Sequence, residues 1–375
     1  MKKRLLSTLL VLALALSCAA CGGGPASSGT ASGSQGGAAT PAPGGQSSTD
    51  KPFAGQTVRV TAWGGAYEET LRNIVVPKFE EETGAKVEII LGSAPIAQLK
   101  AEGDSPSVDV MHLSYYEFET ARMMGVSGEL DYANMSNAAD LYDKAKESPY
   151  GVITNWGNWS YAYRKDLIDE PTSWADLWKP EFAGKIIIGE ITDGAYELAE
   201  MTARTFCDGK SLTDKSTWDT VFQKFEELAP SVYMISASHN DTENALITGD
   251  AVMGVNPNGR TAMLITSGHD DIGFANLKEG TPGMPTYVAV VKNSQVPELA
   301  QALVNELIGV DAEYAYATNN FYAPSNRKCV IPEEIQPLMP YGEEAVENLV
   351  FFDQSTFTEE ERAEFVDRFN KALKN

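Results

Sequence analysis

The sequence contains few residues of the kinds that bind metals or act as nucleophiles. Among its 375 residues there are only three histidines and four cysteines. Beyond residue 51 the cysteines are Cys207 and Cys329, and that part of the chain has no C-x-x-C, H-E-x-x-H or G-x-S-x-G motif. These absences argue against a zinc site and a serine hydrolase, and we expect no cofactor. Whether the two cysteines form a disulfide is left open by the sequence.

Basic residues are also scarce. The chain carries 29 lysines and arginines against 52 acidic residues, which gives a formal charge of −23. Such a surface repels the phosphates of nucleic acids and anionic membrane surfaces. We therefore expect no nucleic-acid partner.

Only the N-terminus has a long apolar run. Lys2, Lys3 and Arg4 precede an apolar stretch over residues 5–16, and small residues follow up to Cys21. The run is too short to span a bilayer comfortably, and its charge and ending are typical of a signal peptide, predicted here over residues 1–20.

The stretch "LSCAACGGG" resembles the bacterial lipoprotein signal, in which a cysteine preceded by small residues is lipidated and becomes the new N-terminus. This resemblance predicts lipidation of Cys21, although Cys18 stands where the pattern prefers an aliphatic residue. The expected location is the outer face of the cell membrane, or the periplasm if the source has an outer membrane. An ordinary secretory signal is the alternative.

Residues 21–54 are predicted to form a flexible tether. From Gly22 to Lys51 the chain is mostly Gly, Ser, Ala, Pro, Thr and Gln. Burial of so little apolar surface cannot offset the entropy lost on ordering.

The folded part begins with strands and helices that alternate. "TVRVTAW" (57–63), "AKVEIILG" (85–92) and "VDVMHLS" (108–114) are typical strands. A helix is predicted over 67–84, because apolar residues recur there at helical spacing and Gly84 can end it, and another over 94–103. The apolar positions of the first helix are Leu71, Ile74, Val75 and Phe79. This order indicates an α/β protein with a largely parallel sheet.

Two of the predicted strands run into aromatic loops, "WGGAYEE" (63–69) and "HLSYYEFE" (112–119). In parallel sheets, ligands bind outside the carboxyl ends of the strands. Neither loop has the G-x-G-x-x-G spacing of a dinucleotide site or the Gly-Lys-Ser/Thr ending of a phosphate loop. The loops therefore favour a cleft lined by aromatic side chains.

Four segments carry a resemblance to a known family. Residues 60–89 ("VTAWGGAYEETLRNIVVPKFEEETGAKVEI") resemble the opening of bacterial ABC-transporter solute-binding proteins, and "PTSWADLWKPEFAGKI" (171–186) resembles a signature of their polyamine-binding branch. "GDAVMGVNPNGR" (249–260) and "NNFYAPSNRK" (319–328) follow in family order.

The resemblance implies a periplasmic-binding-protein-like (type II) fold, in which two α/β lobes enclose a ligand cleft. We expect residues 55–157 and 286–326 in lobe 1, and residues 158–285 and 327–375 in lobe 2. The β-rich segments 150–168 and 283–293 would cross between the lobes, with hinges near Trp156 and Thr286.

The resemblance also implies site residues. In polyamine-binding members, aromatic rings enclose the alkyl chain and carboxylates bind the ammonium groups, as cation–π attraction and charge-assisted hydrogen bonds explain. Three departures put a spermidine-type ligand in doubt: Pro257 and Met284 replace expected tryptophans, and Thr286 replaces an expected aspartate. Arg260 adds a cation suited to a carboxylate or phosphonate. The predicted ligand-binding residues are Trp63, Tyr67, Ser114, Tyr115, Asp193, Asn258, Arg260, Thr286 and Tyr322.

Several of these residues also have a purely structural interpretation. Trp63 could pack at a lobe interface, and Asp193 could cap the helix that follows it. Arg260 could pair with Asp270 or Asp271. On an extended segment, only one of Tyr115 and Tyr116 would face the cleft. Ser173 is expected to begin a helix that carries Trp174 and Trp178, four apart, on one face.

We therefore expect the substrate-binding lipoprotein of an ABC importer. It would be a monomer that captures a small solute, a polyamine or related amine or zwitterion, by lobe closure. Its partners would be a permease with a cytoplasmic ATPase, and the membrane through the lipid anchor. The alternatives are a ferric-ion or phosphonate/carboxylate receptor of the same fold, and an extracytoplasmic enzyme that uses Glu190 and Asp193 for acid–base chemistry.

Overall fold

A computed structural model of the chain describes residues 51–191 and 194–373. The predicted signal peptide, Cys21, most of the predicted tether and Asp193 lie outside the described residues. Within the described ranges, no helix has the length and apolar character needed to cross a membrane.

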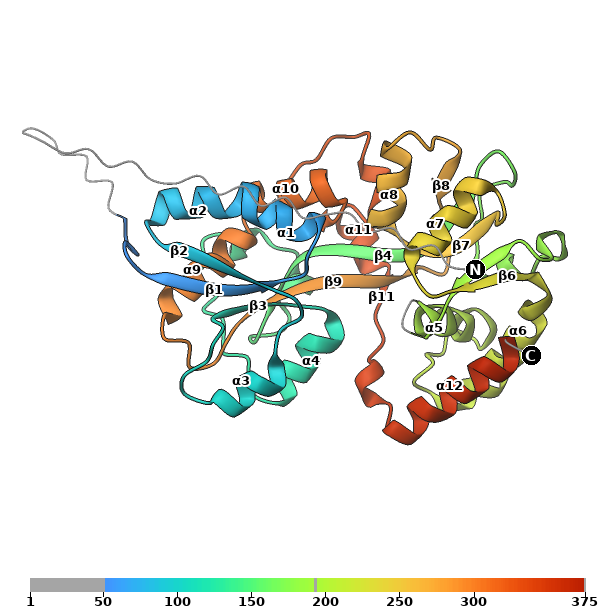
Figure 1. The fold of residues 1–375 in the computed structure, drawn as a ribbon, viewed down its shortest axis with the longest axis horizontal. Helices are drawn as coiled ribbons and strands as arrows, with labels where there is room; N and C mark the ends of the chain where they lie inside the picture. Colours follow the sequence, from blue (N-terminus) through green and yellow to red (C-terminus); the bar gives the residue numbers. More distant parts are fainter. Residues whose placement is uncertain (1–50, 192–193, 374–375) are drawn as a thin grey trace, which may run out of the picture. The chain divides into compact units, whose positions relative to one another are not determined.

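Two sets of parallel strands form the halves of the fold (Figure 1). In the first lobe, β1 (Thr57–Ala62) lies between β2 (Lys86–Leu91) and β3 (Val110–Leu113). In the second lobe, β5 (Ile186–Gly189) lies between β6 (Val232–Ser236) and β7 (Met253–Pro257). The strand order is β2-β1-β3-β9-β4-β7-β5-β6. The predicted α/β class with parallel strands is confirmed.

Two long strands connect the lobes. The first part of β4 (Val152–Arg164) pairs with β9 (Thr281–Val290) and β10 (Ala323–Pro324), and its second part pairs with β7 and β8 (Ile272–Phe274). The ladder is irregular where these strands cross. Its register shifts between Ile153 and Asn155, and Pro285, opposite Trp156, has no N–H to donate. Hinges at Trp156 and Thr286 remain a prediction.

Helices cover both faces of the sheet in each lobe (Figure 1). In the first lobe, α1 (Ala66–Thr70) and α2 (Val76–Thr83) lie on one face, and α3 (Ile96–Glu102) and α4 (Tyr115–Met123) lie on the other. In the second lobe, α7 (His239–Thr248) and α8 (Asn258–Thr266) lie opposite α5 (Ala195–Phe206), α6 (Trp218–Leu228) and α12 (Glu359–Leu373). Each lobe has its own large apolar core.

The predicted helix over 67–84 contains a π-helical turn, Leu71–Val75, between α1 and α2. Leu71, Val75 and Phe79 are buried as predicted, but Ile74 is 44% exposed. A π turn holds more residues than an α turn and so rotates the residues around it, which takes Ile74 off the buried face. Gly84, at φ 73°, ends the helix as expected.

The "SWADLW" segment forms a 3₁₀ helix, Trp174–Trp178, with Ser173 as its cap. Because a 3₁₀ helix has three residues per turn, Trp174 and Trp178 do not share one face as predicted. The Trp174 ring lies 4.8 Å from that of Tyr161, and the Trp178 ring lies 5.0 Å from that of Phe206. Both rings pack in the core of the second lobe.

The chain returns to the second lobe later than residue 327. Cys329, Ile331, Met339 and Val346 still belong to the first-lobe core, which also contains residues of α9 (Pro297–Leu307) and α10 (Val310–Asn320). β11 (Leu349–Val350) then pairs with the start of β9. The segment 351–358, the interlobe connector, leads to α12. Cys329 and Cys207, which follows α5, are both free, so they form no disulfide.

Candidate functional site

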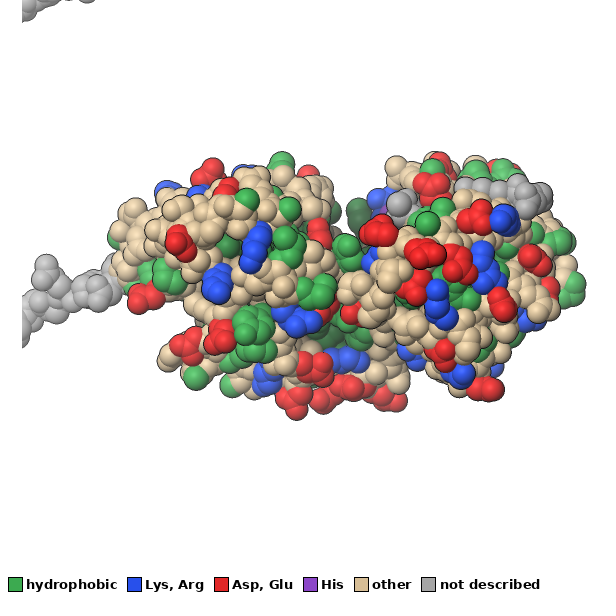
Figure 2. Space-filling view, turned by 90° about the horizontal axis from the view of Figure 1, so that it is seen from below, with side chains coloured by type: hydrophobic (Ala, Val, Ile, Leu, Met, Phe, Trp, Pro, Cys, Tyr) green, Lys and Arg blue, Asp and Glu red, His purple; other side chains and the backbone are tan. Residues whose placement is uncertain are grey.

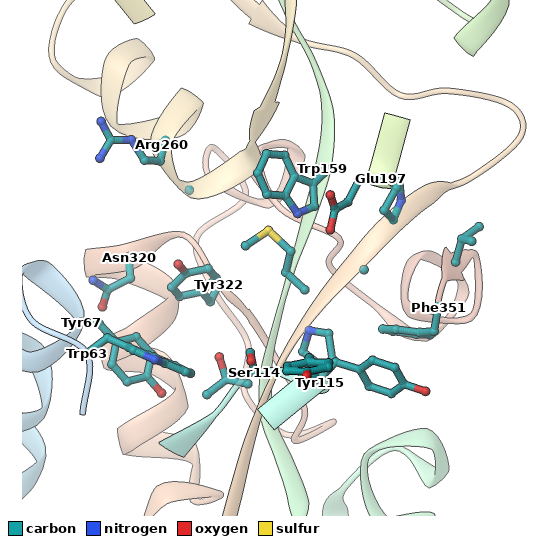
Figure 3. Close-up of a pocket in the computed structure, with 18 of the residues that line it drawn as sticks. Trp63, Tyr67, Ser114, Tyr115, Trp159, Glu197, Arg260, Asn320, Tyr322 and Phe351 are labelled. Atoms are coloured by element: carbon teal, nitrogen blue, oxygen red, sulfur yellow. The ribbon is translucent and has the colours of Figure 1, made fainter. Parts of the chain in front are cut away.

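A cavity of about 590 Å³ lies between the lobes. Figure 2 shows a hollow between the two lobes with hydrophobic side chains deep inside it. Aromatic residues from both lobes dominate its lining (Figure 3): Trp63, Tyr67, Tyr115, Tyr116, Trp159, Tyr322, Phe351 and Phe352.

Trp63 and Tyr67 form the wall where β1 ends. Gly65, at φ 85°, turns the chain into α1, and this conformation favours glycine. The two rings meet edge to face, with centroids 5.5 Å apart. Tyr67 also stacks on Tyr316 at 4.5 Å, and burial raises the pKa of Tyr67. Trp63 is half-buried, so one part of its ring packs and another faces the cavity.

His112, on β3, lies behind this wall. Its ring centroid is 5.4 Å from that of Tyr67, and its Nδ1 is 2.7 Å from the carbonyl oxygen of Thr61. Burial lowers the pKa of His112 to about 4. The imidazole is therefore neutral at physiological pH.

Ser114 and Tyr115 stand where β3 gives way to α4. Ser114 is the N-cap: its hydroxyl accepts from the N–H of Glu117, whose carboxylate accepts from the N–H of Ser114 at 2.8 Å. Tyr115 and Tyr116 are thus the first residues of a helix and not part of an extended segment. They do not alternate as predicted, and both line the cavity.

Arg260 lies in the first turn of α8 and contributes to the lining from the second lobe. Its guanidinium bonds to the Glu243 carboxylate at 2.5 and 2.9 Å, and also donates to Asn240. The structural partner is therefore Glu243 and not Asp270 or Asp271, because α7 packs beside α8 and carries the nearer carboxylate. In Figure 3 the guanidinium points away from the other lining residues.

Asn258 does not line the cavity. Its amide donates to the carbonyls of Phe321 and Leu338, at 2.6 and 2.9 Å, and its Oδ1 accepts from the N–H of Asn158 at 3.0 Å. The side chain is 1% exposed. These three hydrogen bonds hold the start of α8 to neighbouring segments.

Tyr322 and Thr286 both line the cavity. The ring of Tyr322 lies against Gly157 of β4: a Cβ on that glycine would come within 3.1 Å of the ring. Burial raises the pKa of Tyr322. Thr286 belongs to β9, opposite Asn155. Thus the structure brings together seven of the nine predicted residues, Trp63, Tyr67, Ser114, Tyr115, Arg260, Thr286 and Tyr322.

The lining also includes residues that were not predicted, among them Trp159 on β4, Glu197 on α5, Asn320 at the end of α10 and Phe351 on the interlobe connector. The indole of Trp159 packs against Gly194. A Cβ at that position would lie only 2.9 Å from the indole, so the ring needs a glycine there. A signal for Glu197 was present in the sequence, since it follows Asp193 by about one helical turn.

The charges of the lining are few. Among the described residues that line the cavity, Glu197 is the only carboxylate and Arg260 the only cation. No cluster of three or more His, Cys, Asp or Glu side chains in the described ranges could hold a metal ion.

Comparison with known proteins shows the family. Residues 75–340 match the family described as "Bacterial extracellular solute-binding protein". The chain belongs to this family. As a member of this family, it is an extracellular solute-binding protein of the ABC-transporter type. Proteins of this type bind a small solute and interact with a permease.

The individual proteins that this chain resembles share only a modest sequence identity with it. The spermidine/putrescine-binding periplasmic protein of Escherichia coli (strain K12) is 26% identical over 273 residues, which cover 69% of this chain and 76% of that protein. Two solved structures share the fold. A putative extracellular solute-binding protein from Bordetella parapertussis has a TM-score of 0.75 at 21% identity, with coverage of 85% of this chain and 99% of that one. The spermidine/putrescine ABC-transporter substrate-binding protein from Streptococcus pneumoniae has a TM-score of 0.72 at 20% identity, with coverage of 84% and 98%. The two-lobe fold is confirmed.

Proposed function

We propose that this protein captures a small organic amine, or a zwitterion with an ammonium group, in the cavity between its lobes and delivers it to a permease. One observation carries the proposal: the carboxylate of Glu197 lies in a cavity whose walls are otherwise mainly aromatic.

This combination suits an ammonium group on an apolar chain. A carboxylate forms charge-assisted hydrogen bonds to ammonium, roughly twice as strong as neutral ones. The aromatic rings of the same lining, such as those of Trp159 and Tyr322, can each attract a cation by about 0.5–2 kcal/mol. The net charge of −23 also raises the concentration of cationic solutes near the protein.

Relatives described as spermidine/putrescine-binding proteins support an amine ligand. A diamine places two ammonium groups far apart, whereas the described lining offers a single carboxylate. Two helices, α4 and α8, begin beside the cavity, where Tyr115 and Gly259 in their first turns are lining residues. Helix N-termini favour negative groups. We therefore extend the proposal to zwitterions, whose anionic end would lie near these helix starts.

A ferric ion or a purely anionic ligand fits the cavity less well. Such ligands need tyrosinate or cationic groups directed at them. Burial raises the pKa of Tyr67 and Tyr322, which opposes tyrosinate formation, and the Arg260 guanidinium is bound to Glu243.

Capture would proceed by lobe closure. Trp63 and Tyr115 come from the first lobe, and Trp159 and Glu197 from the second. A solute that contacts both sets favours the closed state by its difference in affinity for the two states. We further propose that the solute leaves unchanged, and that a lipid on Cys21 and the tether of residues 21–54 hold the protein at the outer face of the membrane.

The test is a thermal-shift screen with amines, amino acids, betaines, phosphonates and ferric ion, followed by calorimetry. Glu197→Gln should weaken binding of the best amine at least tenfold. Glu226→Gln, an exposed change on α6 that removes the same charge, should leave affinity unchanged. Equal affinities of wild type and Glu197→Gln would refute the amine site, and a ligand product detected by mass spectrometry would favour an enzyme.

A further inference from the structure

Phe351, on the interlobe connector, is one of the aromatic residues that line the cavity. In Figure 3 this residue lies at the end of the site opposite Trp63. The ring centroid is 6.2 Å from that of Tyr115 and 6.0 Å from that of Trp156. Gly283 of β9 makes room for it, because a Cβ there would lie 2.5 Å from the Phe351 ring.

An ammonium group lies close to this ring. The Nζ of Lys144 is 4.9 Å from the ring centroid of Phe351. It donates to the carbonyls of Val346 and Glu347, at 3.1 and 3.4 Å, and it forms no ion pair with any described residue. Lys144 itself is not among the lining residues. Phe351 thus lines the cavity and also contacts a half-buried cation that is outside the lining and has no described carboxylate partner.

We propose that Phe351 is a specificity-determining residue, which limits the length of the solute and hides the Lys144 ammonium from its far end. This inference rests on the proposed capture of an amine. With the ring in place, the far end of a bound solute meets an apolar wall. Without it, that end would meet a cation, which attracts a carboxylate and repels a second ammonium.

Three series of probes separate length from charge in titration calorimetry of the full chain. The n-alkylamines from butylamine to octylamine report length alone. The ω-aminocarboxylates and α,ω-diamines of matching length add a negative or a positive far end. Wild type should reach a maximum of affinity along the alkylamine series.

Phe351→Ala should move that maximum to longer alkylamines, with about a fourfold gain for each added methylene that the new space accepts. Long ω-aminocarboxylates should gain a further tenfold or more, and long diamines should not gain. The double variant Phe351→Ala/Lys144→Met should keep the shift in length and lose the gain for carboxylates. Gly283→Ala, which displaces the ring without truncating it, should shift the length maximum in the same direction if Phe351→Ala folds poorly.

The outcomes are distinguishable. If wild type binds amines but neither Phe351→Ala nor Gly283→Ala changes the length profile, the inference about Phe351 is overturned and the proposed function stands. The inference is also overturned if the carboxylate preference survives in the double variant. If wild type binds no amine of any series, the proposed function fails and this inference fails with it.

Discussion

Trp63 is the residue at which packing and ligand contact can be separated most clearly. Its ring faces the cavity on one side and contacts Tyr67 and His112 on the other. We expect Trp63→Ala to weaken binding of the best amine by roughly 1–3 kcal/mol through loss of the ring contact. Titration calorimetry and thermal melting measure the two effects separately. Unchanged affinity together with a sharply lower melting temperature would show that the ring serves packing alone, and Trp63→Phe is the conservative control.

His112 makes a prediction about acid stability. Its pKa falls from the ordinary value of 6.5 to about 4 on burial, so folding favours the neutral ring. Above pH 6.5 the contribution of His112 to the free energy of unfolding is present in full. As the pH falls from 6.5 towards 4 this contribution is lost, by roughly 3 kcal/mol in total, because the unfolded chain binds a proton that the buried ring does not.

Denaturant unfolding of wild type and His112→Asn at pH 7.5 and pH 4.5 tests this. The variant should lose less of its unfolding free energy between the two pH values than wild type does. An equal loss in wild type and His112→Asn would contradict a buried neutral imidazole.

At the scale of elements, the start of α4 supports both the fold and the site. The capping box between Ser114 and Glu117 fixes the first turn, which presents Tyr115 to the cavity. Ser114→Ala should lower the free energy of unfolding by about 1 kcal/mol. Ser238 holds the N-cap position of α7 without accepting a backbone bond, so Ser238→Ala should cost less. Equal costs in denaturant unfolding would mean that the Ser114 hydroxyl adds no capping energy.

The first strands and helices of the folded part, over residues 57–114, were predictable. The spacing of their apolar residues, and a glycine that ends a helix at Gly84, depend on local backbone geometry alone. The π turn at Leu71–Val75 and the 3₁₀ helix at Trp174–Trp178 were not, since both depend on packing that a periodic pattern does not encode. These two elements explain why Ile74 and Trp178 do not lie on the helix faces that were predicted for them.

The lining residues that directly follow β1 and β3 could be predicted from the sequence. Trp159, Asn320 and Phe351 escaped prediction because they come from a crossing strand, a helix end and the interlobe connector. These segments are far apart in sequence and meet only after both lobes have formed. Asn258 is adjacent in sequence to Gly259 of the lining but does not line the cavity itself. Its amide donates instead to the carbonyl oxygens of Phe321 and Leu338, and nothing in the sequence indicates these hydrogen bonds.

For the whole molecule, the predicted anchor sets where the cavity operates. Cys21 follows small residues after the apolar run, and we expect it to carry lipid. Cys21→Ala should move the protein from the detergent phase to the aqueous phase in phase partition. Retention of the variant in the detergent phase would contradict the lipoprotein prediction.

The most direct test of the account is a crystal structure of the protein with its tightest-binding amine. The ammonium nitrogen should lie about 2.7–2.9 Å from the Glu197 carboxylate. Aromatic rings of both lobes, with Trp63 and Trp159 among them, should contact the solute. An amine bound outside this cavity, or one inside it whose nitrogen lies away from Glu197, would contradict the account.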